Sequence, residues 1–316
     1  MDKADDDIKV SICVVTYNQE NYIQSCLKSL VEQDVSFRFE IVVGDDCSTD
    51  STKKIVESFR ENYPDLIVPV YHEENVGAVE NTCAVYKKSR GLYICHMDGD
   101  DAALPDKLKE QVAVLDANSE CVLCTHDALV IDKDGQVLRD SLKRKVEGIY
   151  DQNELLRDLP FFTNSTKMVR RQVCLESIKN LAKDAIDVEF HVLEASFGCI
   201  YHIDKSLGMY RQLVGVSSAQ ARVNPLVVAG YARLYEGLFF SKKMDMSKKE
   251  LRKLYAKSML NFSYQSLFFG CYEDARTYAK RSFSIRFYSV KQLALIFLSF
   301  SGRFAFCLVR LRGKFK

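Results

Sequence analysis

The fold class is decided by the stretch Leu92-Tyr93-Ile94-Cys95-His96-Met97-Asp98-Gly99-Asp100-Asp101. It starts as an apolar run of strand type and ends in three carboxylates within four residues. Gly99 lies between two of the acids, where its backbone freedom allows a tight bend. A buried strand that ends in carboxylates places oxygen ligands at a sheet edge, where open α/β folds bind their ligands. We therefore expect a divalent metal, Mg²⁺ or Mn²⁺, at this turn together with substrate phosphates.

A plainer interpretation of the same acids is a surface turn in which one of them caps the next helix. Asp101 suits that role, because Ala102–Leu108 follows it with the composition of a helix start. Aspartate is a favoured helix N-cap residue. For Asp101 both interpretations remain open from the sequence alone.

Strand-like and helix-like segments alternate at a short period through the first half of the chain. The expected strands are Val10–Asn18, Phe39–Asp46 and Ile67–Tyr71, followed by the central strand at residues 92–98. The expected helices are Asn21–Gln33, a segment from about Ser48 to Asn62, and Gly77–Ser89. Such alternation predicts parallel pairing with right-handed crossovers. The predicted fold class is α/β, a Rossmann-like and mostly parallel sheet flanked by helices.

Polar residues stand where three of these strands end, namely Thr16-Tyr17-Asn18, Asp45-Asp46 and Asp98-Gly99-Asp100. In a parallel sheet the three ends lie on one edge, so side chains separated by dozens of residues are expected to converge. Each group taken alone also has a local explanation as turn or helix-start residues. The convergence is therefore the stronger argument for a binding crevice.

Four segments in this order and spacing resemble the family 2 glycosyltransferases of GT-A fold: Val14–Asn18, Val43–Asp50, Asn75–Gly77 and Met97–Asp101. The resemblance runs from about Val10 to about Ser218 and includes Pro105–Leu108 after the acids. It implies a nucleotide-diphosphosugar donor, usually a UDP-sugar.

The same resemblance implies a role for each polar strand end. It assigns Asp98 to the ribose and Asp100 to the divalent metal on the diphosphate. Asp46 or its neighbour Asp45 is implied as the acceptor of a hydrogen bond from the base. A cation there suits the chemistry, because the leaving nucleoside diphosphate develops charge. The nucleotide pocket is implied to contain Thr16, Tyr17, Asn18, Asn75 and Gly77.

Three features of the sequence refine the family assignment. Many relatives carry a basic residue before an Asn on the helix after the Asn-x-Gly turn, but Val79-Glu80-Asn81 has none. The segment Gly208–Ser218 resembles the family's closing loop, which implies a diphosphate contact from Arg211. The chain has no Trp and so lacks the Gln-x-x-Arg-Trp signature of processive synthases. We expect the transfer of a single sugar.

An inverting transferase needs a general base that takes the proton from the acceptor hydroxyl. The candidates are Asp184, Asp187 and Glu189. The resemblance favours Asp187, at the start of an apolar helix, although the family's usual Glu before this Asp is Ile186 here. Apolar neighbours raise the pKa of a carboxyl, which suits a base. The alternative role for Asp187 is a helix N-cap.

The composition, with 47% apolar and 28% charged residues, is that of a folded protein, and a net charge of +1 gives no reason to expect nucleic acid as a partner. The 11 Cys, scattered through apolar segments, indicate a reducing compartment with buried thiols. A zinc site at Cys121-x-x-Cys124 with His126 is a weaker hypothesis than core packing, because no second ligand pair has zinc-finger spacing.

The domain prediction is a catalytic domain at residues 1–222 and a helical region at residues 223–316. Helical spacing covers Pro225–Lys243, Ser247–Phe269 and Tyr272–Ile285, and a more apolar segment follows at Val290–Val309. The basic end Arg310–Lys316 favours an amphipathic helix lying in a membrane surface over a spanning helix. The acidic N-terminus is no secretory signal. We expect a cytoplasmic protein on the inner membrane face.

The function predicted from the sequence is a metal-dependent, inverting transfer of one sugar from a nucleotide-diphosphosugar. The expected acceptor is an oligosaccharide or a lipid-linked glycan in polysaccharide biosynthesis. Two alternatives use the same carboxylates: a metal-dependent phosphohydrolase and a non-catalytic sugar-nucleotide-binding subunit. The phosphohydrolase would release phosphate without an acceptor and needs no base at Asp187.

Overall fold

Strand β1 (Ile8–Thr16) lies between two parallel neighbours, because its residues Val10–Val14 are buried on both faces. The computed structural model describes residues 8–143, 145–212, 214, 222–241 and 244–300. Their contacts divide the chain into two units, Met1–Gly215 and Val216–Lys316. The boundary predicted at residue 222 lies a few residues after this division.

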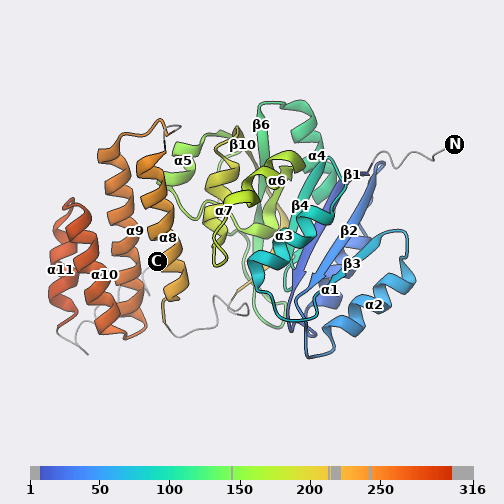
Figure 1. Cartoon of the computed structure of the whole chain (residues 1–316), viewed down its shortest axis with the longest axis horizontal. Coiled ribbons are helices and arrows are strands. Elements are labelled where there is room, and N and C mark those ends of the chain that lie inside the picture. Colours follow the sequence, from blue (N-terminus) through green and yellow to red (C-terminus); the bar gives the residue numbers. More distant parts are fainter. Residues whose placement is uncertain (1–7, 144, 213, 215–221, 242–243, 301–316) are drawn as a thin grey trace. The chain divides into compact units, whose positions relative to one another are not determined.

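One mixed sheet of ten strands organises the first unit, with the order β3-β2-β1-β4-β9-β6-β10-β5 (Figure 1). Strands β3, β2, β1 and β4 are mutually parallel, as are β6 and β10. Strand β9 runs antiparallel between β4 and β6, and β5, β7 and β8 are antiparallel additions. The remaining bounds are β2 (Arg38–Asp45), β3 (Ile67–Tyr71), β4 (Tyr93–Asp98), β5 (Ala102–Ala103), β6 (Cys121–Ile131), β7 (Val137–Arg139), β8 (Gly148–Tyr150), β9 (Lys167–Arg170) and β10 (Cys199–Arg211).

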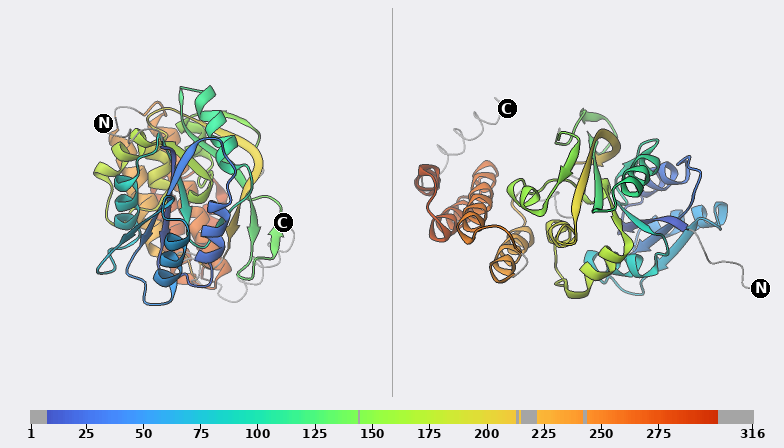
Figure 2. Two further views of the ribbon diagram at one scale, coloured as in Figure 1. Left: turned by 90° about the vertical axis from the view of Figure 1, so that its right-hand side faces the viewer. Right: turned by 90° about the horizontal axis from the view of Figure 1, so that it is seen from above.

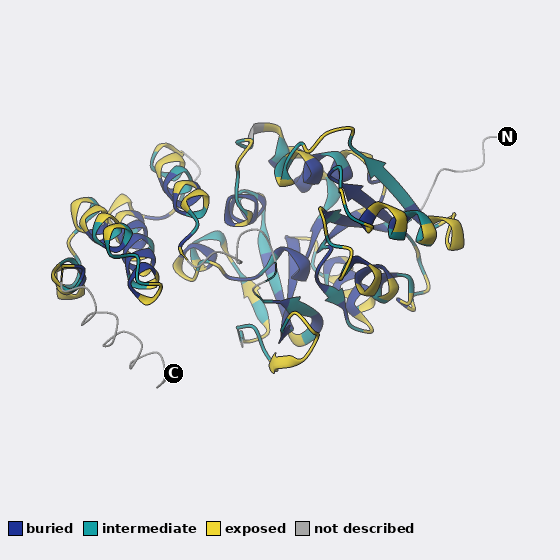
Figure 3. Ribbon diagram, turned by 90° about the horizontal axis from the view of Figure 1, so that it is seen from below, coloured by how far each residue is buried: buried dark blue, intermediate teal, exposed yellow. Residues whose placement is uncertain are grey.

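Helices cover both faces of this sheet (Figures 1 and 2). On one face α3 packs on β1 and β2, and α6 packs on β4 and contacts α7; on the other, α4 packs on β6 and β10. The helices are α1 (Ile23–Val31), α2 (Thr52–Asn62), α3 (Ala78–Lys88), α4 (Lys107–Ala117), α5 (Gln152–Arg157), α6 (Arg171–Ser177) and α7 (Asp187–Glu194). The central strands are buried and the outer helix faces exposed (Figure 3). The predicted α/β class with a flanked central sheet is therefore confirmed.

The second unit is helical, with α8 (Pro225–Phe240), α9 (Lys248–Phe268), α10 (Tyr272–Ile285) and α11 (Val290–Leu298). Buried serines tie α9 to α10: Ser263 Oγ donates to the Ala275 carbonyl at 2.7 Å, and Ser282 Oγ to the Ala256 carbonyl at 2.6 Å. Of the described residues, no helix is both long enough and apolar enough to cross a membrane. The predicted amphipathic end after residue 300 lies outside the described residues.

Candidate functional site

The ends of β1 and β2 are joined to each other by hydrogen bonds. The Asp46 amide donates to the Thr16 carbonyl at 3.0 Å. Asn18 has a positive φ of 51°, which turns its side-chain oxygen toward the Thr49 amide at 2.8 Å. Its own amide donates to Ser48 Oγ at 2.9 Å. The segments expected to form the nucleotide pocket therefore form one loop pair, beside which Tyr17 is exposed.

The two acids at the end of β2 make different contacts. Asp46 is buried, and its carboxylate accepts from the amides of Val76 at 2.7 Å and Gly77 at 2.9 Å. Gly77 has φ of +89°, and the Asn75 side chain donates to the Asp46 carbonyl at 3.3 Å. Asp46 thus fixes the turn before α3. The remaining lone pairs of its carboxylate could accept a hydrogen bond from the base of a nucleotide.

Asp45 is the second of these acids, and it accepts a hydrogen bond from Ser48 Oγ. Burial raises its pKa, and the Ser48 hydrogen bond only partly opposes that effect. Asp45 therefore lies inside the fold, where it holds the loop that begins at Cys47.

The central acidic turn lies against the end of β1. The Gly99 amide donates to the Val15 carbonyl at 2.9 Å. A Cβ at residue 99 would lie 3.0 Å from Thr16 Cβ and 2.4 Å from Gln19 Oε1, so the turn packs tightly against the end of β1 and any larger residue would have to displace the Gln19 side chain. Thr16, Asp46 and the Asp98–Asp100 turn consequently meet at one sheet edge.

Asp98 is held from two sides and is still accessible to a ligand. His96 Nε2 lies 3.2 Å from one carboxylate oxygen, and Ser165 Oγ donates to the other at 3.3 Å. Tyr86 Oη in turn lies 2.9 Å from His96 Nδ1. Burial raises the pKa of Asp98, but the contacts with His96 and Ser165 outweigh it and lower the pKa below its usual value. Because 34% of its side chain is exposed, an ionised carboxylate is available here.

Asp100 and Asp101 have raised pKa values. Burial, and then the charge of Asp98, raise the pKa of Asp100 to about 6. The same causes and the charge of Asp100 raise the pKa of Asp101 well above its usual value. Asp101 Oδ1 accepts from the Arg211 amide at 2.7 Å, while Oδ2 is buried and makes no hydrogen bond with the described residues.

The interpretation of Asp101 as a helix cap is wrong. Helix α4 begins six residues later, and its N-cap position is Asp106. The reason is that Ala102 and Ala103 pair with β10 as strand β5, which carries Asp101 into the sheet edge.

Arg211 is the last residue of β10, and its side chain donates hydrogen bonds to backbone carbonyls of the acidic turn and of a neighbouring loop. Its Nε donates to the Asp100 carbonyl at 2.8 Å, and Nη1 donates to the Asp132 carbonyl at 2.7 Å. The guanidinium also lies 4.7 Å from the centre of the Tyr22 ring. Arg211 therefore stabilises the turn at which we expect the metal to bind. Its contact with the diphosphate stays a prediction. Ser217 and Ser218 of the predicted closing loop lie outside the described residues.

Asp187 is the first residue of α7, and its side chain is exposed. Desolvation by the surrounding protein, followed by the charge of Asp98, raises the pKa of Asp187. A hydrogen bond from the Asn164 side chain lowers it in part. Asn164 is itself held by His191, whose Nε2 lies 3.0 Å from Asn164 Oδ1. An exposed carboxylate with a raised pKa beside the acidic turn has the properties of a proton acceptor.

Of the two rival bases, Glu189 is less suited to that role. Glu189 is buried, and its carboxylate accepts from the Ile186 amide at 2.9 Å, which closes the first turn of α7. Asp184 is exposed in the loop before the helix.

Tyr210 is acted on by the negative charge of four acids of the site. Its pKa is raised to about 12 by burial and by Asp101, Asp98, Asp100 and Asp187, in that order. Sequence reasoning gave Tyr210 no role of its own within the segment that resembles the closing loop. It gave none to Asn164 and Ser165 either, although their segment, Phe161–Arg171, resembles the family segment that borders the acceptor cleft. His96 is the one neighbour of Asp98 named here that a local pattern predicts, because residues i and i+2 of a strand lie on the same face of the sheet.

The acidic turn fits a divalent cation. Its ligands are carboxylate oxygens, the type that Mg²⁺ and Mn²⁺ prefer. Burial, and then the negative charge of Asp98, raise the pKa of Asp100, and the charge of Arg211 opposes them only in part. A bound cation would remove that repulsion.

Known proteins match the chain over this region. The profile of glycosyl transferase family 2 matches residues 11–177. This chain belongs to that family. The match contains the polar strand ends and the acidic turn, and it stops before Asp187 and Arg211.

Relatives of this glycosyltransferase family 2 chain cover it to different extents. The Mycobacterium tuberculosis protein Rv1520 is 32% identical over 205 residues, which are 64% of this chain and 58% of that protein. The poly(ribitol-phosphate) beta-N-acetylglucosaminyltransferase TarS of Staphylococcus aureus is 38% identical over 117 residues, 37% of this chain and 20% of TarS. The matched regions thus span about three fifths and one fifth of these relatives.

Solved structures share the fold over nearly the whole chain. TarS residues 1–349 in complex with UDP-GlcNAc match with a TM-score of 0.67 at 19% identity, covering 96% of this chain and 89% of that one. The mannosyltransferase PcManGT from Pyrobaculum calidifontis, in complex with GDP-Man and Mn²⁺, matches with a TM-score of 0.59 at 18% identity, covering 92% and 79%. The GT-A fold predicted from the sequence is confirmed.

Proposed function

We propose that this chain is an inverting, metal-dependent glycosyltransferase that moves one sugar from a UDP-sugar to a glycan or lipid-linked acceptor. The observation that carries the proposal is the meeting of Thr16, Asp46 and the Asp98–Asp100 turn at one edge of the sheet. Two similar structures contain a nucleotide sugar, UDP-GlcNAc in TarS and GDP-Man with Mn²⁺ in PcManGT. Both complexes support a nucleotide-sugar donor, and the choice of UDP follows the TarS complex and the resemblance of the sequence to enzymes that usually take a UDP-sugar.

On the donor side, the loop pair of Tyr17 and Asn18 receives the nucleoside, and Asp46 accepts from its base. Asn75 and Gly77 shape the turn beside that base. Asp98, ionised and oriented by His96 and Ser165, accepts from the ribose. Asp100 would hold Mn²⁺ or Mg²⁺, which would neutralise the charge that develops on the leaving diphosphate.

On the acceptor side, Asp187 takes the proton from the acceptor hydroxyl. The hydroxyl oxygen then attacks the anomeric carbon on the face opposite the diphosphate, and the bond from that carbon to the diphosphate oxygen breaks. The configuration at the anomeric carbon is therefore inverted. A raised pKa suits Asp187 to this step, because a base works best when its pKa lies near the working pH.

The acceptor and the location are proposed from charge and from relatives. Residues 223–316 hold 18 Lys and Arg against 5 Asp and Glu, whereas residues 1–222 hold 26 against 38. Exposed aromatic residues of α8 and α11, Phe240 and Phe297, accompany this positive charge. Basic and aromatic residues together suit the anionic inner face of a membrane. The poly(ribitol-phosphate) in the name of TarS supports a polymer as the kind of acceptor.

The test begins with a panel of nucleotide sugars and Mn²⁺, in which thermal stabilisation identifies the donor. Turnover is then measured as UDP release with and without lipid-linked acceptors. Asp187→Asn is expected to lower kcat at least 100-fold while the Kd for the donor changes less than twofold, because general base catalysis contributes about 10²–10⁴-fold.

Asp184→Asn is the matched control, since it makes the same change three residues away on the surface. Unchanged turnover in Asp187→Asn would remove Asp187 from the mechanism. Equal phosphate release with and without any acceptor would favour a phosphohydrolase. Donor binding without turnover under any condition would favour the non-catalytic subunit.

A further inference from the structure

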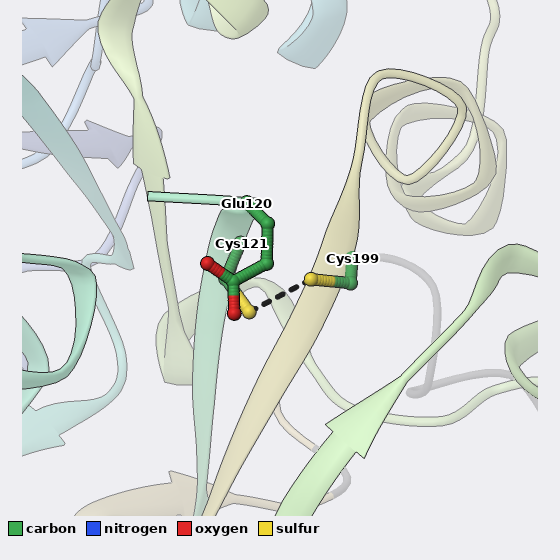
Figure 4. Close-up of side chains that lie close together, drawn as sticks. All are labelled: Glu120, Cys121 and Cys199. Carbon is green, nitrogen blue, oxygen red and sulfur yellow. Dashed lines mark hydrogen bonds between the residues drawn. The ribbon is translucent and has the colours of Figure 1, made fainter. Parts of the chain in front are cut away.

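Two cysteines face each other at the sheet edge opposite the acidic turn. Cys121 is the first residue of β6 and Cys199 the first residue of β10, and the two are partners in the parallel register. Their Sγ atoms lie 2.8 Å apart, with the Glu120 carboxylate beside them (Figure 4). The acidic turn lies at the other ends of these strands, so the pair belongs to no site described above.

The separation of the sulfurs decides between two chemistries. A zinc ion that binds two thiolates at about 2.3 Å in tetrahedral geometry holds the sulfurs roughly 3.8 Å apart. At 2.8 Å the two sulfurs are too close for a shared metal ion and near the bonding distance of about 2.05 Å. Cys124 takes no part, since its Sγ contacts the Thr125 carbonyl at 3.9 Å.

Burial also favours a disulfide, which is uncharged, over a pair of thiolates on a metal ion. Cys121 is fully buried, and burial followed by the neighbouring Cys199 raises its pKa to about 12. A pair of thiolates on a metal would place charge in this environment, whereas a disulfide carries none. Cys199 is partly exposed, so it is the more accessible of the two cysteines.

We propose that Cys121 and Cys199 form a reversible disulfide by exchange with a small-molecule disulfide. The Cys199 sulfur attacks one sulfur of the reagent, forms a mixed disulfide and releases one thiol. The Cys121 sulfur then attacks Cys199 Sγ and releases the second thiol. The pair is oxidised by two electrons, the reagent is reduced to two thiols, and the protons of the cysteines pass to those thiols.

The cross-link would act on the acceptor side of the molecule. The chain between Cys121 and Cys199 contains β9, Asn164 and Asp187, so closing this loop limits how far that segment can unfold. A disulfide across such a loop stabilises mainly by restricting the unfolded chain. In a reducing compartment the pair stays open, and oxidation closes it. The proposal does not depend on the proposed function.

The experiment uses the full chain, reduced, desalted without oxygen, and incubated with oxidised glutathione. Free thiols are blocked with N-ethylmaleimide, and the tryptic digest is examined by mass spectrometry. We expect a peptide that links Cys121 to Cys199 with the loss of two hydrogens, and its disappearance with dithiothreitol. We also expect the Tm to rise by roughly 5–10 °C on oxidation.

Three variants separate the outcomes. Cys124→Ala, on the same tryptic peptide as Cys121, is the matched control and should keep both the link and the Tm rise. Cys199→Ala and Cys121→Ala should each lose both, so that a folding defect in one leaves the other informative. Glutathione on Cys199 without a link, or a link through Cys124, overturns the proposal. So does Zn²⁺ binding that Glu120→Gln abolishes, with no link on oxidation.

Discussion

Replacing Asp100 by Asn is predicted to stabilise the first unit of the chain while abolishing metal binding. The fold raises the pKa of this carboxyl to about 6, first through burial and then through the charge of Asp98, whereas an unfolded Asp titrates near 3.9. A difference of about two units corresponds to about 3 kcal/mol between the protonated and ionised states. The value belongs to the cluster of Asp98, Asp100 and Asp101, which titrate together.

The sign of the effect follows from proton binding. Between about pH 4 and pH 6 the folded chain keeps a proton that the unfolded chain has released, so the free energy of unfolding falls as the pH rises. Above about pH 6 both states are ionised, and the full loss of about 3 kcal/mol is present. Asp100→Asn cannot ionise, so it should be more stable than the parent at pH 7.5 by up to about 3 kcal/mol and equal to it near pH 4.

The assay is urea unfolding in EDTA at pH 4.5, 6.0 and 7.5, with Asp106→Asn as the control because Asp106 is exposed at the start of α4. In the parent, the affinity for Mn²⁺ should rise about tenfold per pH unit below pH 6 and level off above it, since the ligand must be deprotonated. Calorimetry with Asp100→Asn should show no Mn²⁺ binding. A variant no more stable than the parent at pH 7.5, or a flat Mn²⁺ affinity from pH 5 to 7, would refute the reasoning.

Three further predictions concern stability and are read by urea unfolding. Arg211→Lys should lose about 1.5–3 kcal/mol, because an ammonium cannot reach both backbone carbonyls that the guanidinium holds; a loss below 0.5 kcal/mol would contradict that bracing role. Lys167→Met should lower the free energy of unfolding by about 3–5 kcal/mol, because it leaves Glu194 buried without its partner. The double variant with Glu194→Met should lose far less. Equal losses would argue against the ion pair as the cause. Gly91→Ala should lower the free energy of unfolding by about 1–3 kcal/mol, because its Cβ would lie 2.4 Å from a backbone nitrogen. Gly237→Ala, in open space within α8, should instead raise it by about 0.5–1 kcal/mol. The reverse order would show that backbone crowding at Gly91 is relieved.

The parallel half of the sheet could be predicted because its signal is local. Continuous apolar runs such as Val10–Val14 indicate strands buried on both faces, and polar residues mark where each strand ends. The rule that parallel strands end at one edge then places Thr16, Asp46 and Asp100 together without any structure. The helices that the structure describes in the second unit follow in the same way from helical spacing.

The remaining parts of the site depend on contacts between distant segments, which a sequence pattern does not contain. Ser165 orients Asp98 from a position 67 residues later in the chain. The short strand β5 arises from pairing with β10, and it removed Asp101 from the helix-cap role. Asp46 is adjacent to Asp45, yet only the fold shows that it fixes the turn at Gly77.

The three acids of the central turn differ in ionisation because each contacts a different partner. His96 and Ser165 stabilise the charge of Asp98, so it remains ionised and raises the pKa of both neighbours. The Arg211 amide donates to Asp101 Oδ1, but burial and the charges of Asp98 and Asp100 favour the neutral form of Asp101. Asp100 lies between these extremes: with a pKa of about 6 it is mostly ionised at neutral pH, and its carboxylate is therefore ready to bind a cation. Arg211 donates to both the Asp100 carbonyl and the Asp101 carboxylate, so the last residue of β10 fixes the backbone from which these two acids project.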